Sequence, residues 1–331
     1  MSGPAGMSGP TQVDFLLPTG NSATIPADNP YMTAPRQVLP AVTYLVTRRC
    51  SERRFFLRPS ELVNQVFSYC LAYAANRHGI LLHAWTCLSN HYHAVVSDPK
   101  ANLPLFMADL NRLVSKCVNA SLGRWESLWS SERYSAVSLT DESAVWEKLI
   151  YVLANPVQGG LVNTWQEWPG VTSGPRAVTA KPRTIRRPDL FFRGDGTMPE
   201  KVTLWATLPP CFSGDKAGRF ATRLGRALDS HEAEILAAHR AENRSVLGRD
   251  AVLRENPEKR PKSFEPRRGV NPQIAGRDRW LRTEALRRLR SFLDSYREAW
   301  KKFREGIRDV LFPAGTYWMC RHAGCEAVPL D

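Results

Sequence analysis

LSNHYHAVV, at residues 88–96, begins with a polar turn, and its β-branched and aromatic side chains predict a β-strand over residues 91–97. Residues two apart on a strand project to the same face, so the imidazoles of His91 and His93 point the same way and can share one divalent cation. A lone His-x-His pair is a weak signal, because such residues are more often structural. The segment therefore predicts a strand and a candidate metal site that needs a further group from elsewhere in the chain.

The elements around this strand define a fold class. The turn at residues 89–90 joins it to a strand over residues 80–88, which gives a hairpin. Hydrophobic periodicity predicts strands over residues 42–47 and 134–139 and helices over residues 59–79, 104–123 and 140–154. The resulting order is that of a split βαβ unit. We therefore expect an α+β fold: a ferredoxin-like antiparallel sheet with helices on one face, followed by a mostly helical basic extension.

The last of these helices carries a candidate nucleophile. Tyr151 lies on its more polar side, and Asn155 follows one turn later on the same face. The Asn155-Pro156 pair is expected to end the helix at about residue 154. A phenol in this place is available for attack, and the amide oxygen is a candidate third metal ligand. An amphipathic surface tyrosine is the alternative interpretation.

Positive charge is concentrated in the second half of the chain. The 45 Lys and Arg residues exceed the 32 Asp and Glu residues by 13. Residues 1–175 contain 13 basic and 12 acidic side chains, and residues 176–331 contain the other 32 and 20. This excess predicts an acidic partner, of which nucleic acid is the usual one, and binding that weakens with salt. A solubilising surface is the alternative.

Other side chains are candidates for nucleic-acid contacts. Four arginines follow the first predicted strand: Arg48, Arg49, Arg53 and Arg54. They would bind DNA phosphates beside the sheet, or form a solvated basic turn. Trp125 and Trp129 could stack on bases, although core packing is the commoner role. His83, on the neighbouring strand, is expected to face either the core or the site.

Cysteine usage and hydropathy indicate the compartment. The seven cysteines are scattered, which predicts reduced thiols in the cytoplasm. The expected nucleic-acid partner would make the protein nucleoid-associated. Cys320, His322 and Cys325 lie close together without a fourth ligand nearby, which argues against zinc. No apolar run approaches the ~18 residues that span a bilayer, and no signal peptide is expected, so no membrane partner is predicted.

Composition divides the chain into five expected regions. These are a loose tail (1–38), the split βαβ domain (39–165), a linker rich in Pro, Gly and Arg (166–202), a helical basic extension (203–312) and a second tail (313–331). Within the extension, residues 216–241 and about 280–310 are predicted helices. The second helix has an apolar stripe whose expected role is packing. A self-association seam is the alternative, so we expect a monomer or a homodimer.

Two segments resemble one protein family. LSNHYHAVV is similar to the His-hydrophobe-His motif of single-tyrosine HUH transposases, and YVLANPVQGGLV, at residues 151–162, is similar to the tyrosine helix of the REP-associated tyrosine transposases. The segment between them, MADLNRLVSKCVNASLGRWESLWSSERY at residues 107–134, resembles the middle segment of that branch. The likeness covers about residues 40–165. Both motifs lie in the right order on the right elements.

The resemblance implies roles for individual residues within an HUH nuclease domain. His91 and His93 match the metal ligands, Tyr151 the nucleophile, and Asn155 the polar residue that completes the metal site. Ser89 stands where the family usually has proline, and Asn155 replaces the glutamine common in the wider group. The cofactor expected at a mixed imidazole and oxygen site is Mg²⁺ or Mn²⁺.

The implied activity is that of a metal-dependent transposase. It would cut and rejoin single-stranded or hairpin DNA through a 5′-phosphotyrosine, in DNA transposition or in the processing of REP-like hairpins. The second hypothesis is a catalytically silent, domesticated regulator that binds hairpin DNA. The third is a ferredoxin-like RNA-binding module, although such modules usually present aromatic side chains where the paired imidazoles lie. The complete His, His and Tyr set favours the enzyme.

Overall fold

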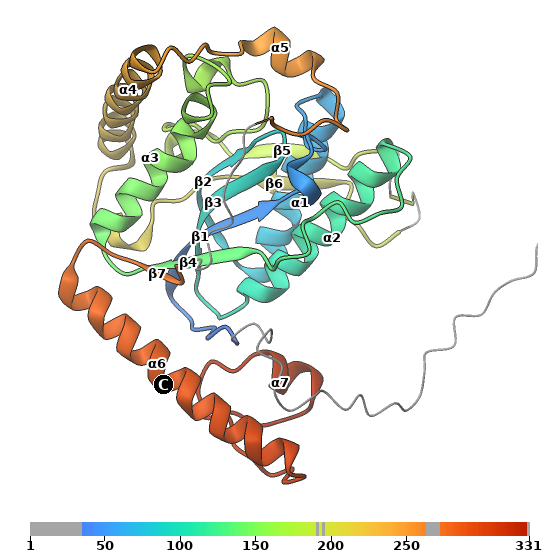
Figure 1. The fold of residues 1–331 in the computed structure, drawn as a ribbon, viewed down its shortest axis with the longest axis vertical. Helices are drawn as coiled ribbons and strands as arrows, with labels where there is room; N and C mark the ends of the chain where they lie inside the picture. Colours follow the sequence, from blue (N-terminus) through green and yellow to red (C-terminus); the bar gives the residue numbers. More distant parts are fainter. Residues whose placement is uncertain (1–34, 190–191, 194–195, 263–271, 330–331) are drawn as a thin grey trace, which may run out of the picture. The chain divides into compact units, whose positions relative to one another are not determined.

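Five strands form the main sheet, in the order β2-β3-β1-β4-β7. The computed structural model describes residues 35–189, 192–193, 196–262 and 272–329. The strands of this sheet are β1 Val42–Arg49, β2 Leu81–Cys87, β3 His91–Asp98, β4 Ser135–Leu139 and β7 Ile274–Ala275. β7 runs parallel to β4, and the other neighbours are antiparallel. The order β4-β1-β3-β2 confirms the expected ferredoxin-like split βαβ fold (Figure 1).

Helices connect and cover these strands. The α-helices are α1 Glu61–His78, α2 Leu103–Ser121, α3 Glu142–Gln158, α4 Ala217–Ala241, α5 Arg249–Arg254, α6 Arg279–Arg304 and α7 Trp318–His322. The short 3-10 turns are η1 Ser51–Arg53, η2 Trp165–Glu167, η3 Ala177–Thr179 and η4 Pro210–Phe212. None of the helices in the described part of the chain is both long and apolar enough for a membrane span.

Helices cover both faces of the sheet, so the expectation of one covered face was wrong. Tyr44 and Tyr92 lie in the core that α1 and α2 cover. Leu45 and Val95 lie in the core on the other face, which α3 covers (Figure 1). The reason is visible in residues 44–46, which are buried without a break rather than alternately. A strand buried on both faces needs a covering layer on each. This arrangement places α3 over the face toward which the odd-numbered residues of β3 project.

α3 continues past its expected end and finishes at Gln158, with Pro156 inside the helix. A proline removes only its own N–H from the helical ladder, and the next turn is closed by the Gly159 N–H, which donates to the Asn155 carbonyl at 3.0 Å. Asn155 and Gln158 therefore stay on the same helix as Tyr151, which fixes where their side chains emerge.

The segment 166–202, expected as a linker, forms structure of its own. β5 Arg183–Arg186 pairs antiparallel with β6 Lys201–Leu204 in a separate two-stranded sheet. Ile185 and Val202 are buried in the same core cluster as α1. Each strand has four residues. A run this short offers too few alternating positions to be recognised among Pro, Gly and Arg.

α4 is part of the core rather than a separate attachment. Its predicted bounds, residues 216–241, differ from the observed ones by a single residue. Phe220, Leu224 and Leu228 are buried in the cluster that also contains α3. The described residues from 35 onward accordingly form one compact unit.

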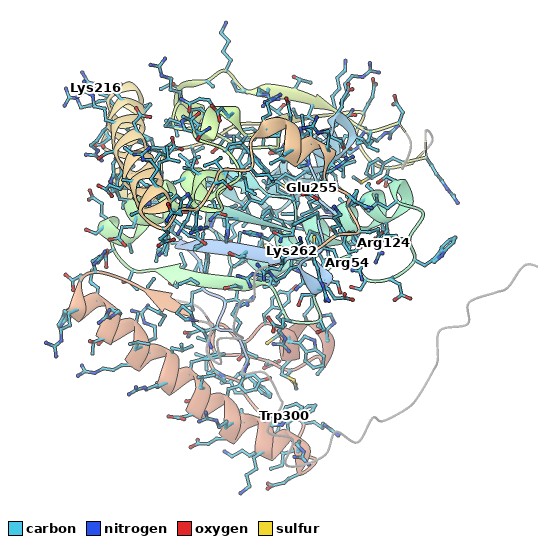
Figure 2. The ribbon with its side chains drawn as sticks, turned by 45° about the horizontal axis from the view of Figure 1, so that its top comes forward. Arg54, Arg124, Lys216, Glu255, Lys262 and Trp300 are labelled. Carbon is cyan, nitrogen blue, oxygen red and sulfur yellow. The ribbon has the colours of Figure 1, made fainter. Side chains whose placement is uncertain are left out.

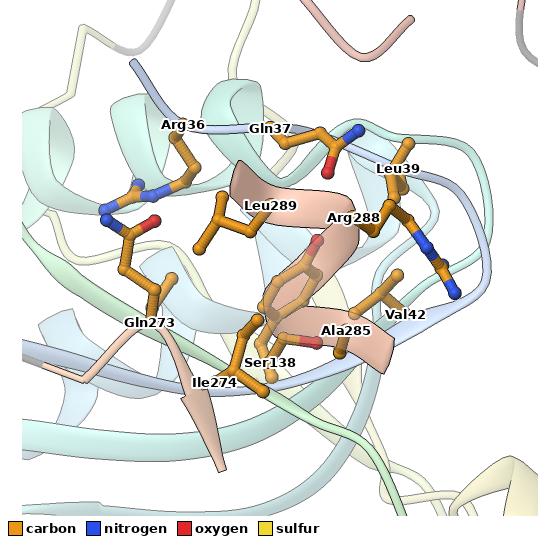
Figure 3. Close-up of a pocket in the computed structure, with 12 residues that line it drawn as sticks. Arg36, Gln37, Leu39, Val42, Ser138, Gln273, Ile274, Ala285, Arg288 and Leu289 are labelled. Carbon is orange, nitrogen blue, oxygen red and sulfur yellow. The ribbon is translucent and has the colours of Figure 1, made fainter. Parts of the chain in front are cut away.

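α6 ends earlier than predicted and packs beside the edge of the sheet. Gly306 has a φ of 98°, a left-handed conformation typical of helix ends, so the predicted helical positions beyond it lie outside the helix. Ala285 and Leu289 of α6 share the lining of a cavity of about 90 Å³ with Ile274 of β7 (Figure 3). The candidate site residues His91, His93 and Tyr151 do not line this cavity.

The final segment, residues 313–331, was expected as a tail, and its described part is packed. α7 contributes Met319 to a buried cluster with Phe312, Cys325 and Ala299 of α6. Burial of these apolar side chains packs the segment that follows α6 against α6 itself. Residues 330–331 lie outside the described residues.

The expected N-terminal tail, residues 1–38, is described only from residue 35 onward. Its last part is attached to the C-terminal segment, because the Val38 N–H donates to the Gly315 carbonyl at 3.0 Å. Val38 itself is buried. Residues 1–34 lie outside the part of the chain that the structure describes.

Candidate active site

His91 and His93 project from β3 to the face that α3 covers. Tyr92, between them, points the other way into the α1–α2 core, where its hydroxyl donates to Asn111 Oδ1 at 2.7 Å. The centroids of the two imidazole rings are 4.7 Å apart, and the rings are nearly perpendicular at 84°. The strand therefore brings both imidazoles to one place, as the two-residue spacing predicts.

Tyr151 meets this pair from α3. Its hydroxyl oxygen lies 3.4 Å from His93 Nε2, and the two ring centroids are 5.1 Å apart. The Lys148 ammonium lies 5.7 Å from the centroid of the Tyr151 ring. The hydroxyl therefore lies beside the histidine pair, in contact with the buried His93 side chain.

A pocket of about 210 Å³ surrounds these groups. It is lined by Arg49, Arg53, Asn90, His91, His93, Tyr151, Asn155, Gln158 and Gly159. Tyr151, Asn155 and Gln158 lie four and three residues apart, so one face of α3 supplies all three. Gln158 was not identified from the sequence, because the helix was expected to end before it. The only sequence feature that could have indicated Gln158 is its position three residues after Asn155, because residues three apart share a helix face.

Two neighbours of the imidazoles were also missed, and they fix the ring orientations. Asn90 Nδ2 donates to the Arg53 carbonyl at 3.1 Å, so its Oδ1, 2.6 Å from His91 Nδ1, is the acceptor. The His91 Nδ1–H therefore donates to Asn90, which leaves Nε2 as the ring nitrogen that can face a cation. Thr47 Oγ1 lies 2.7 Å from His93 Nδ1 and can accept a hydrogen bond from it in the same way. Partners of this kind orient metal-ligating histidines.

Burial controls the protonation of His93, whose exposed fraction is 5%. Desolvation lowers the pKa of His93 well below its usual range, and the nearby His91 and Arg49 lower the pKa further. His93 is therefore neutral near pH 7. A neutral imidazole keeps a lone pair that can bind a cation, whereas a protonated one does not.

The four predicted arginines divide into two pairs. Arg49 and Arg53 line the histidine pocket. Arg48, on the other face of β1, donates to the carbonyls of Ser130 and Glu132. The second arginine outside the pocket, Arg54, forms ion pairs with Glu52 and Glu258. The sequence did not show which arginines line the pocket. For Arg48 and Arg49 the strand face decides this, and for Arg54 its ion pair with the distant Glu258 does.

The turn that carries Arg53 has a strained backbone. Glu52 and Arg53 both have positive φ, at 51° and 60°, although neither is glycine. Consecutive left-handed residues of this kind cost about 1–3 kcal/mol each and persist only where their surroundings hold them. The hydrogen bond from Asn90 to the Arg53 carbonyl is one such restraint. The strained backbone therefore lies at the edge of the pocket that Arg53 lines.

The remaining candidates have other places. His83 is buried between the Thr207 carbonyl at 2.9 Å and Ser97 Oγ at 2.8 Å. Trp129 is buried and donates to the Asn111 carbonyl, whereas Trp125 is 95% exposed. Neither tryptophan nor His83 lines the histidine pocket. Of the two candidate tryptophans, Trp125 is the one whose ring is exposed.

The pocket's donor set fits a divalent cation of the expected kind. The Nε2 atoms of His91 and His93 are candidate ligands, and Asn155 supplies an amide oxygen donor at the same pocket. No group of three His, Cys, Asp or Glu residues with metal-binding spacing occurs in the described ranges, and this includes Cys320, His322 and Cys325. Two imidazoles and one amide leave coordination positions that oxygen ligands from phosphate or water can fill.

The orienting residues give a direct prediction. Replacing Thr47 by Val, or Asn90 by Ala, removes the partner of one imidazole and should weaken Mn²⁺ binding about 10- to 100-fold. Isothermal titration measures the affinity. Thr43→Val is the matched control, because it removes a hydroxyl hydrogen bond of 2.7 Å elsewhere on β1. Equal Mn²⁺ affinity for all three variants and the unchanged chain would contradict the assigned roles.

Fold and site together define an α+β protein with a split βαβ sheet and a histidine–tyrosine pocket. No known family profile matches the chain, and no curated protein does. Among solved structures, one described as a REP-associated tyrosine transposase bound to a REP hairpin is 15% identical, with a TM-score of 0.35, and the match covers 53% of this chain and 99% of that one.

A second solved structure is described as a putative transposase from Deinococcus radiodurans R1. It is also 15% identical, with a TM-score of 0.27, over 35% of this chain and 93% of that one. Both structures are thus described as transposases. At this identity and these TM-scores, the functional assignment of the chain depends on its own residues.

Proposed function

We propose that this protein is a transposase-type enzyme that cleaves single-stranded or hairpin DNA and transfers the strand through a covalent tyrosine intermediate. The observation that carries the proposal is the approach of the Tyr151 hydroxyl to 3.4 Å from His93 Nε2, in a pocket that His91 and two arginines also line. Incubating labelled hairpin DNA with the protein and Mn²⁺ should give a protein–DNA adduct on a denaturing gel.

The chemistry assigns a role to each group. Tyr151 Oη would form a bond to the scissile phosphorus while the bond from phosphorus to the 3′ oxygen breaks, which leaves a 5′-phosphotyrosine and a free 3′-hydroxyl. The phenol loses one proton and the leaving oxygen gains one, so the step is balanced. A Mg²⁺ or Mn²⁺ ion bound by His91, His93 and Asn155 would offset the negative charge on the phosphate.

The residues of the pocket complete this arrangement. The Nδ1 partners Thr47 and Asn90 keep the imidazoles from rotating, which reduces the reorganisation needed for the reaction. Arg49 and Arg53 would bind the nonbridging phosphate oxygens of the strand. Because the phosphodiester energy is retained in the tyrosine ester, attack by a second 3′-hydroxyl can rejoin DNA without ATP.

Arg49 and Arg48 provide a matched test of DNA contact. Arg49→Ala should weaken binding of a single-stranded oligonucleotide and reduce the slope of log affinity against log salt by about 0.7, the value for one phosphate contact. Arg48→Ala should leave that slope unchanged, because the Arg48 guanidinium is bonded to the carbonyls of Ser130 and Glu132. Fluorescence anisotropy across a salt series measures both. The same slope change in both variants would contradict the assignment.

A silent, domesticated regulator that binds hairpin DNA is the second candidate. It predicts hairpin binding without an adduct under any metal condition. The close contact between Tyr151 and His93 favours the enzyme, since a binder has no need of a nucleophile beside paired imidazoles. An RNA-binding module, the third hypothesis, would show preference for RNA over DNA in the same binding assay.

The second half of the chain would supply much of the affinity for DNA. α6 exposes Trp280 and many basic side chains, and its last turn contains Lys301, Lys302 and Arg304. Since α4 belongs to the core, deleting residues 203–331 would disrupt the fold as well as remove charge. Substituting exposed basic residues of α6 is therefore the appropriate way to examine this role. We propose a monomer or a homodimer as the acting form.

A further inference from the structure

A segment from the second half of the chain crosses the turn that carries Arg53. This segment, residues 253–260, begins in the last turn of α5, continues beyond it and is called the strap. It lies along residues 51–58, which follow β1, and Figure 2 labels Arg54, Arg124 and Glu255 in this region. The two segments are about 200 residues apart in the chain. Nothing in the local sequence of either predicts the contact.

Carbonyl groups of the strap accept hydrogen bonds from residues 55 and 58. The Phe55 N–H donates to the Lys259 carbonyl at 2.9 Å. Arg58 Nη1 donates to the carbonyls of Leu253 at 2.8 Å and Glu255 at 3.3 Å. Because these contacts involve main-chain carbonyls near both ends of the strap, they hold its backbone in place.

The Glu258 carboxylate lies at the centre of the contact. It pairs with Arg54 and with Arg124, each at 3.2 Å. The Arg54 guanidinium also donates to the Glu258 carbonyl at 3.0 Å and forms an ion pair with Glu52 at 3.1 Å. Arg260 of the strap lies 3.7 Å from the same Glu52 carboxylate. One acidic side chain thus joins two arginines from separate elements to the strap.

These contacts continue to the active site. Glu52 and Arg53 are the two left-handed residues of the turn, and such a conformation needs external restraint. Beyond the turn, the Arg53 carbonyl accepts from Asn90 Nδ2 at 3.1 Å. Asn90 Oδ1 in turn accepts from His91 Nδ1 at 2.6 Å. The polar contacts of Glu258 with Arg54, the backbone from Arg54 to Arg53, and the polar contacts of Asn90 therefore join Glu258 to a predicted metal ligand.

We infer that the strap is a positioning element of the active site and that Glu258 is its positioning residue. It holds the strained turn so that Arg53 lines the pocket and Asn90 orients the His91 ring. The C-terminal half of the chain thereby completes the site instead of only adding positive charge. This inference rests on the proposed function, because it assigns Glu258 to the same pocket.

The experiment compares Glu258→Gln with the unchanged full-length protein. Mn²⁺ affinity is measured by isothermal titration, and affinity for a single-stranded oligonucleotide is measured in EDTA. We expect each affinity to fall about three- to tenfold, less than the 10- to 100-fold effect typical of a residue that contacts a metal ligand directly. Glu200→Gln is the matched control, since it removes an exposed ion pair with Arg186 at 3.4 Å on the separate β5–β6 sheet.

A double-variant cycle separates positioning from general stabilisation. If Glu258 acts through Arg53, Glu258→Gln should weaken oligonucleotide binding little further in a chain that already carries Arg53→Gln. A loss that is the same in both backgrounds would overturn the inference, as would unchanged affinities in the single variant. Absence of an adduct from the unchanged protein would contradict the proposed function, whereas the Mn²⁺ affinities would still decide the role of the strap.

Discussion

Tyr151→Phe should abolish the covalent protein–DNA product while leaving affinity for hairpin DNA within about twofold of the unchanged protein. The substitution removes one oxygen, the atom that lies 3.4 Å from His93 Nε2. Loss of a nucleophile lowers the rate of a covalent step by at least about a thousandfold. The ring remains and still packs against His93, so the pocket keeps its shape. A denaturing gel measures the adduct, and anisotropy measures binding.

Tyr73→Phe is the control for this comparison. Tyr73 lies on α1, beyond the opposite face of the sheet, and its hydroxyl accepts from Arg77 at 2.6 Å. Its loss should leave adduct formation unchanged. If Tyr151→Phe still formed the adduct at the normal rate, another residue would be the nucleophile and the assignment of Tyr151 would be wrong.

His91→Ala should give the second large effect. The His91 side chain is half-buried, so its removal disturbs the core less than removal of the almost fully buried His93. With one of two imidazoles lost, Mn²⁺ affinity and the rate of adduct formation should each fall about 100-fold or more, beyond the effect of an orienting residue. Adding excess EDTA to the unchanged protein should suppress the adduct to the same extent.

The matching control is His231→Ala. His231 lies on α4, where its side chain is 40% exposed and lies 3.6 Å from Glu234. This variant should bind Mn²⁺ and form the adduct normally. Adduct formation that persists in EDTA, together with normal activity of His91→Ala, would show that the reaction needs no metal at the histidine pair.

The sequence predicted the shared face of the two imidazoles and the nearness of the later helix to the sheet. A two-residue step on β3 directs two imidazoles to one face, and the split βαβ order brings the later helix to that sheet. The face of the sheet that α3 covers was not predicted. Unbroken burial of residues 44–46 shows that both faces are covered, and only the structure establishes that α3 lies on the side of His93.

The supporting residues could not be predicted in this way. Thr47 reaches His93 only because β1 and β3 pair in a particular register, which a single sequence does not specify. Gln158 enters the pocket because α3 tolerates Pro156, against the usual effect of proline on helices. The strap contacts Arg54 across about 200 residues, so neither segment carries a local signal of the other.

The most direct measurement is to map the attachment site of DNA on the protein. Hairpin DNA is incubated with the protein and Mn²⁺, the product is digested with trypsin and nuclease, and the modified peptide is sequenced by mass spectrometry. The account predicts a nucleotide joined through its 5′ phosphate to Tyr151, within the peptide of residues 149–176. A nucleotide on any other side chain, or no modified peptide from any single-stranded or hairpin substrate, would contradict it.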